Sequence, residues 1–174
     1  MRMFCVVLAL LGMARTCAAQ TGAASHQVFE VKIKKDVLQD LVRSGEASGL
    51  KGLVLPQFRI YNRKGQQVAD LGGRVGDDFK ERVEAALKHP SPTSSDKTLS
   101  WEVERIADTA DTSFADADFT FVVYWAEWCK PCEAERKLMI EILNSHPELN
   151  VNVLHVEADP VKAFPDSHIV KPGS

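Results

Sequence analysis

The 174-residue chain has no excess of positive charge and few cysteines. It carries 21 lysines and arginines against 24 aspartates and glutamates, a formal net charge of −3. This balance argues against a nucleic-acid partner, because non-specific binding to nucleic acid depends on a basic surface. Four cysteines are too few for a disulfide-dense scaffold. There is no internal repeat and no glycine-rich phosphate loop, so the composition is that of one ordinary globular domain.

The first nineteen residues have the order of a secretory signal peptide. Arg2 gives a positive start, an apolar run follows over 4–14, and small residues reach Ala19. The run is about half the ~20 residues that a helix needs to span a bilayer. We expect residues 1–19 to be cleaved after Ala18 or Ala19, and the protein to act in the periplasm or to be secreted across the bacterial envelope.

Two other interpretations of this segment stay open. One is an N-terminal membrane anchor or a buried helix. The other is a lipoprotein acylated at Cys17, although Arg15 and Thr16 stand where small apolar residues are usual. Signal cleavage would leave no integral membrane segment and a single cysteine pair, Cys129 and Cys132.

Hydrophobic periodicity predicts an α/β domain over residues 20–174, in which 89–97 is a linker rich in proline and small polar residues. Half-buried strands alternate apolar and polar residues, whereas a continuous apolar run fits a central strand covered on both faces. The predicted strands are Val28–Lys34, Gln57–Asn62, Gln67–Leu71, a weaker one through Leu99, Trp101 and Val103, Phe119–Trp125 and Val151–Val156. Residues 105–118 fit either a helical turn or a loop.

Helices are predicted from capping patterns and apolar spacing. Asp36 with Gln39, and Asp78 with Glu81, each match a capping box, and Gly45 suits the end of the first helix. A third helix follows the cysteine pair and ends before His146-Pro147. The side chains expected on the buried faces are Val37, Leu38, Leu41 and Val42; Phe79, Val83, Ala86 and Leu87; and Ala134, Leu138, Met139, Ile142 and Leu143.

The segment Cys129-Lys130-Pro131-Cys132 stands between the apolar run 119–125 and that third helix. At the start of a helix, unpaired backbone N–H groups and the helix dipole favour a thiolate. Lys130 adds a positive charge, and Pro131 fits the first helical turn. A two-residue spacing brings the sulfurs close enough to form and break a disulfide, and an exported protein with one such pair invites a redox interpretation. We expect Cys132 to be buried beneath a more exposed Cys129.

The nine residues Tyr124-Trp-Ala-Glu-Trp-Cys-Lys-Pro-Cys132, between a strand and a helix, resemble the active-site segment of the thioredoxin family. The resemblance extends from about 118 to 159. It implies a thioredoxin-like α/β fold of three layers, with a mixed central sheet flanked by helices. It also implies a thiol–disulfide oxidoreductase in which Cys129 attacks protein disulfides and Cys132 resolves the mixed disulfide. Independently of the resemblance, Trp128 and Trp125 can shield the apolar side of the site, and only Trp128 is expected to be part of it.

The order of the elements departs from that of the family. There, the active-site strand and helix precede a hairpin that is led by a cis-proline and followed by a closing helix. Here the similar hairpin, 50–73, and the similar helix, 78–88, come first. The resemblance therefore implies a circular permutation, in which 28–88 is the family's C-terminal half and 98–159 its active-site half.

This arrangement predicts that Pro56 is the cis-proline and lies beside Cys129. It also leaves two candidates, Val28–Ile33 and Val151–Val156, for one position in the sheet, so one of them is expected to be an added edge strand.

A second departure concerns proton transfer. Many thioredoxins bury an acid in the active-site strand, and the corresponding residue here is Val123. Glu127 is a weak substitute that could act only through water. The missing acid keeps a second function open, that of a redox-inert thioredoxin-like binding module.

The remaining candidate residues are given ordinary roles. A structural zinc site needs about four ligands, and the five histidines are scattered, so we expect no metal and no cofactor. We interpret Trp101, Trp125 and all the histidines, His155 among them, as core or surface residues. The expected partners are protein thiols or disulfides and an unidentified redox partner. Lys-Pro between the cysteines fits a reductant, an oxidant or an isomerase.

Overall fold

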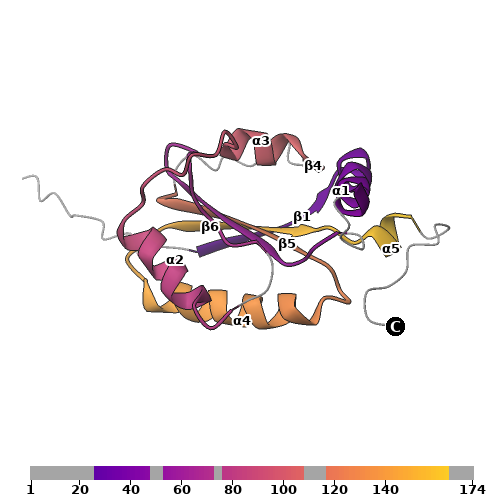
Figure 1. The fold of residues 1–174 in the computed structure, drawn as a ribbon. Helices are drawn as coiled ribbons and strands as arrows, with labels where there is room; N and C mark the ends of the chain where they lie inside the picture. The colour runs from indigo at the N-terminus through magenta and orange to yellow at the C-terminus, as the bar shows by residue number, and fades with distance from the viewer. Residues whose placement is uncertain (1–25, 48–52, 73–75, 108–116, 165–174) are drawn as a thin grey trace, which may run out of the picture.

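The computed structural model describes residues 26–47, 53–72, 76–107 and 117–164. The predicted signal peptide, the start of the segment 50–73 and His168 lie outside the described residues. Within them, the chain forms three layers, with a mixed β-sheet between two layers of helices (Figure 1). The predicted fold class, α/β with a mixed central sheet and flanking helices, is confirmed.

The sheet has six strands in the order β3-β2-β5-β6-β1-β4. The neighbours β5, β6 and β1 are parallel, whereas β2, β3 and β4 each run antiparallel to the strand they pair with. In chain order the strands are β1 (His26–Ile33), β2 (Gln57–Asn62), β3 (Gln67–Asp70), β4 (Ile106–Ala107), β5 (Phe119–Trp125) and β6 (Val151–Glu157). The five longer strands were predicted and are confirmed. No strand was predicted at β4, since residues 105–118 were expected to form a helical turn or a loop.

The two strands expected to compete for one position lie side by side instead. β1 pairs with β6 in parallel register along its length, with Glu30 opposite His155. The two-residue strand β4 pairs with the end of β1 on its other side. The sheet therefore accommodates both strands, and β1 is the outer of the two.

Helices from separate parts of the chain cover each face of the sheet (Figure 1). On one face, α2 (Phe79–Lys88) and α4 (Lys130–Ser145) pack on side chains of β2, β5 and β6. On the other lie α1 (Lys35–Ala47), α3 (Leu99–Glu104) and α5 (Pro160–Ala163). The predicted inward residues of α1 and α2 are buried or partly buried, and so are four of the five in α4; Ala134 is exposed.

Ala134 is exposed because the face of α4 that meets the sheet runs through Cys132, Glu135 and Met139 instead. Two details of α1 were also predicted wrongly. The helix begins at Lys35, so Asp36 lies in the first turn, where its Oδ1 accepts a hydrogen bond from the N–H of Val37 at 2.9 Å. It continues past Gly45, because one glycine costs a helix only about 1 kcal/mol.

The α2 capping box is also absent. Asp78 is the N-cap residue, but its side chain makes no capping hydrogen bond. A capping side chain needs an extended backbone at its own residue. The backbone at Asp78 is already helical, with φ −86° and ψ −1°.

The predicted strand through Leu99, Trp101 and Val103 is a helix, α3. Thr98 caps it, since its hydroxyl accepts a hydrogen bond from the N–H of Trp101 at 3.3 Å. Glu102 on this helix is fully buried and faces the sheet. Its carboxylate accepts hydrogen bonds from Arg59 at 2.8 Å, Tyr61 at 2.7 Å and Tyr124 at 2.5 Å.

Candidate functional site

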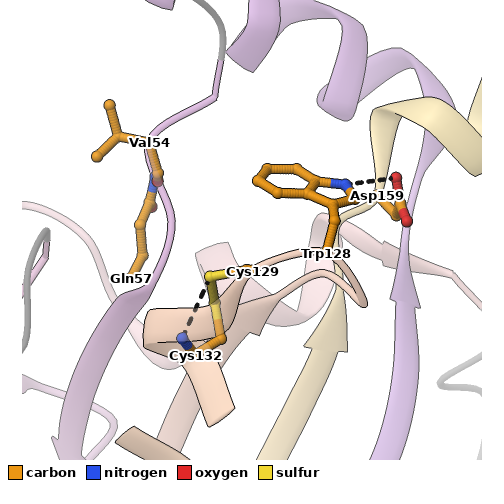
Figure 2. The surroundings of a disulfide bond; sticks show 6 residues. All are labelled: Val54, Gln57, Trp128, Cys129, Cys132 and Asp159. Atoms are coloured by element: carbon orange, nitrogen blue, oxygen red, sulfur yellow. Dashed lines mark hydrogen bonds between the residues drawn. A yellow bond between two sulfur atoms is a disulfide. The ribbon is translucent and has the colours of Figure 1, made fainter. Parts of the chain in front are cut away.

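The cysteine pair lies where β5 ends and α4 begins. The N–H of Cys129 donates to the carbonyl of Ala126 at 3.0 Å, which turns the chain from strand to helix. Cys129 is then the N-cap of α4, and its Sγ accepts a hydrogen bond from the N–H of Cys132 at 3.2 Å. Pro131 stands in the first turn, as predicted. The two cysteines are joined by a disulfide, with their Cα atoms 5.3 Å apart (Figure 2).

Both sulfurs are enclosed in this disulfide form. Cys129 is 6% exposed and Cys132 5%, so the expected difference in exposure is absent. Ala126 and the two cysteines form a small apolar cluster on which Leu55, Trp125 and Trp128 pack. What distinguishes the cysteines is their place on the helix. Cys129 is outside the first turn, where its sulfur receives an N–H, whereas Cys132 is inside that turn.

Trp128 connects the cysteine loop to the end of β6. Its indole Nε1–H donates to Oδ1 of Asp159 at 3.0 Å, and the same oxygen caps α5 by accepting from the N–H of Val161 at 2.9 Å (Figure 2). Lys162 on α5 pairs with Glu127 at 2.8 Å and with Glu157 at 2.9 Å. Glu127, the weak candidate base, is therefore held in an exposed ion pair with Lys162.

The segment before β2 runs beside the disulfide. Figure 2 shows Val54 and Gln57 across from Cys129 and Cys132, and Leu55 between them packs on the cysteine cluster. The Leu55–Pro56 peptide bond is cis, and Pro56 is buried. Pro56 thus belongs to the segment that runs beside the cysteines, although 73 positions separate it from Cys129 in the sequence. Its role in substrate binding stays a prediction.

A buried acid lies on α4 rather than on the active-site strand. Glu135 is one helical turn after Cys132, is 1% exposed, and faces the sheet. Neither carboxylate oxygen has a hydrogen-bond partner among the described residues. Burial therefore raises the pKa of Glu135 to about 8. The sequence analysis considered the strand position, Val123, and Glu127, and missed Glu135. Its three-residue spacing from Cys132 is the signal that could have found it.

A pocket of about 190 Å³ opens beside the disulfide. Its walls include both cysteines, Lys130, Trp125 and His155, together with Ala126, Glu127, Glu133 and Arg136. The rings of Trp125 and His155 stack in parallel with centroids 4.6 Å apart. Trp125, interpreted as a core or surface aromatic, and His155, interpreted as a surface or strand histidine, thus both belong to the wall of the site.

Other kinds of site are not apparent in the described parts of the chain. No group of three or more His, Cys, Asp or Glu side chains there is placed to hold a metal ion. Nor do the helices of those segments include one long and apolar enough to cross a membrane.

Comparison of the chain with family models, with curated proteins and with solved structures finds no match. The geometry itself therefore carries the functional argument. It consists of an α/β domain with a mixed sheet and a close Cys-x-x-Cys pair at a strand-to-helix junction, an arrangement that suits thiol–disulfide exchange.

Proposed function

We propose that the protein is a thiol–disulfide oxidoreductase of the thioredoxin type that acts on protein disulfides. The observation that carries the proposal is the position of the redox pair: Cys129 caps α4 and its sulfur already accepts a backbone N–H. The same N–H and the helix dipole would stabilise a thiolate on Cys129 after reduction.

The exchange uses two steps in the reducing direction. The Cys129 thiolate attacks one sulfur of a substrate disulfide, forms a mixed disulfide and releases one substrate thiolate. Cys132 then loses its proton and attacks Sγ of Cys129, which restores the Cys129–Cys132 disulfide and releases the second substrate thiol. Two electrons pass from the cysteine pair to the substrate, and the reverse sequence oxidises a substrate dithiol.

Circular permutation of the thioredoxin fold belongs to this proposal. The β2–β3 hairpin and α2 precede the active-site strand in the chain, yet β2 pairs with β5 directly. Leu55, just before β2, packs on the cysteine cluster, which supports the expectation that the segment around Pro56 belongs to the site. Residues 89–96, exposed and irregular, lead from α2 toward the active-site half.

The site of action is proposed from the sequence. The signal-like order of residues 1–19 favours export to the periplasm or beyond, where disulfides form and persist. A single cysteine pair would then meet protein thiols and disulfides.

One observation favours the second candidate, a redox-inert binding module. Both sulfurs are nearly enclosed in the disulfide form, which would hinder attack by a large substrate. Equilibration with dithiol and disulfide buffers, followed by thiol alkylation and mass measurement, distinguishes the two. The oxidoreductase should gain two thiols in one transition at roughly −120 to −270 mV, the range of cycling thioredoxin-like pairs. A pair that stays oxidised well below about −300 mV would favour the binding module.

A further inference from the structure

The pocket beside the disulfide contains a histidine that the exchange steps above do not use. His155, on β6, is 3% exposed and lines the same pocket of about 190 Å³ as Cys129 and Cys132. In the sheet it stands opposite Val123 of β5, the strand position where the thioredoxin resemblance leads one to expect an acid. A titratable side chain therefore lies one strand away from the expected place.

Glu30 and Trp125 fix the imidazole ring. Nδ1 of His155 lies 2.7 Å from Oε2 of Glu30, its partner across β1 and β6. An ionised carboxylate can only accept a hydrogen bond, so the neutral ring carries its proton on Nδ1. Nε2 is then the nitrogen free to accept a proton. The stacked Trp125 ring prevents the imidazole from tilting.

Charged groups from β1, from α4 and from the loop before α4 lie near this imidazole or line its pocket. Glu30 reaches it from β1 and Arg136 from α4, while Glu133 of α4 and Lys130 and Glu127 near the helix start line the same pocket. Burial lowers the pKa of His155, Arg136 acts in the same direction, and Glu30 opposes both. The shift is downward, so the ring is neutral at pH 7 and able to accept a proton.

Glu135 is the competing proton acceptor. Because burial raises its pKa to about 8, Glu135 is mostly protonated at pH 7, and in that form it is a proton donor. His155 is in the accepting form at the same pH. The direction of the two shifts therefore favours the imidazole as the base at neutral pH.

We propose that His155, oriented by Glu30, accepts the proton of the Cys132 thiol through water in the shared pocket during the second exchange step. The inference rests on the proposed oxidoreductase function. The proton moves from Sγ of Cys132 to Nε2 of His155, which becomes an imidazolium paired with Glu30. The Cys132 thiolate then attacks Sγ of Cys129, the mixed disulfide breaks, and the departing substrate thiolate takes a proton from the imidazolium. A pocket of this volume has room for the connecting water, which needs only about 10–15 Å³.

The test separates the two steps. The reduced protein is mixed with a disulfide-bonded peptide, quenched with acid at intervals, and analysed by mass for the mixed disulfide and the released peptide. In His155→Gln, the mixed disulfide should form at the wild-type rate and resolve about 100-fold more slowly at pH 7. In the wild-type protein, the resolution rate should rise with pH below about pH 6.5, as His155 loses its proton. In His155→Gln this rise should be absent.

Three further variants make the assignment specific. Glu30→Gln should also slow resolution. An amide can either accept or donate a hydrogen bond, so it no longer fixes the proton on Nδ1 of His155. His155→Ala should regain part of its rate when imidazole is added, which a purely structural role would not allow. His89→Gln makes the matched change at an exposed histidine that ends α2, and should resolve like wild type.

Each remaining outcome counts against the proposal. Wild-type resolution in His155→Gln, or a slow step found only in Glu135→Gln, would assign the proton to another group and leave the oxidoreductase function standing. Failure of the wild-type protein to form or resolve a mixed disulfide would remove both the His155 role and the function on which it rests.

Discussion

At the scale of single residues, two cysteines with nearly equal exposure differ through the backbone around them. Cys129 caps α4 and its sulfur accepts an N–H, whereas Cys132 lies within the first turn. The helix start favours negative charge on the first sulfur, so exposure in the disulfide form is a poorer guide to the nucleophile than position.

The nucleophile can be assigned by alkylation. In the reduced protein, Cys129 should react with iodoacetamide at a pH well below the ordinary thiol pKa of about 8.5, because the helix start stabilises its thiolate. Cys129→Ser should abolish turnover, and Cys132→Ser should accumulate mixed disulfides with substrates. Labelling of Cys132 before Cys129 would reverse the assignment.

Glu135 makes the stability of the fold depend on pH. Its pKa is raised from about 4.5 to about 8, so the folded protein binds more protons than the unfolded chain between these values. The stabilisation is complete below about pH 4.5 and is lost as the pH rises through about 8, with an upper limit of roughly 5 kcal/mol. In urea unfolding, the free energy of unfolding of Glu135→Gln, compared with that of the wild-type protein at the same pH, should be more favourable at pH 9 than at pH 5. An identical pH dependence in the two proteins would contradict the raised pKa.

Among the helices and strands, α3 is hydrogen-bonded to the sheet through one buried carboxylate, that of Glu102. Glu102 accepts hydrogen bonds from Arg59 and Tyr61 of β2 and from Tyr124 of β5. Burial, followed by the Glu102 charge, raises the pKa of both tyrosines, which keeps their hydroxyl groups as donors. The cluster lies on the face of the sheet that α1, α3 and α5 cover, opposite the face on which α4 packs.

Removing this carboxylate should loosen α3 and take from the buried Arg59 its shortest ion pair, leaving it the longer contact with Asp70 at 3.4 Å. We expect Glu102→Ala to lower the free energy of unfolding by about 3–5 kcal/mol, measured by urea denaturation. Glu104→Ala, at an exposed position of the same helix, is the matched control and should change it by less than about 0.5 kcal/mol. Equal effects of the two substitutions would mean that the cluster contributes little.

The local sequence pattern predicted β2 and α2 well, because their apolar residues repeat at the spacing of the element they form. It predicted β5 because a continuous apolar run fits a central strand that is covered on both faces. It failed at α3, where the spacing of Leu99, Trp101 and Val103 is that of a strand. There the Thr98 cap and the contacts of Glu102 with residues over 20 positions away decide the conformation. Contacts at such distance leave no local periodicity to detect.

At the scale of the whole molecule, the site is assembled from distant parts of the chain. The cysteine loop and the segment around Pro56 were both predicted, because a motif and a turn pattern mark them. The Glu30–His155 pair was missed, since 125 positions separate its members and only the pairing of β1 with β6 joins them. The buried Glu135 was missed because a charged residue beside the cysteines suggests an exposed helix face.

The proposed export can be tested on the intact protein. Cleavage after Ala19 should give an envelope protein that starts at or near Gln20 and lacks Cys5 and Cys17. Intact-mass analysis of the envelope fraction reads the N-terminus directly. A lipid adduct on Cys17 would establish the lipoprotein interpretation instead, and an uncleaved chain would favour an anchor.

The central claim is that Cys129 and Cys132 exchange with protein disulfides as a cycling pair. The most direct measurement is the reduction of insulin by dithiothreitol in the presence of catalytic amounts of the purified protein. We expect many turnovers for the wild-type protein, a background rate for Cys129→Ser, and a loss of multiple turnover in Cys132→Ser. A wild-type rate no faster than that of Cys129→Ser would contradict it.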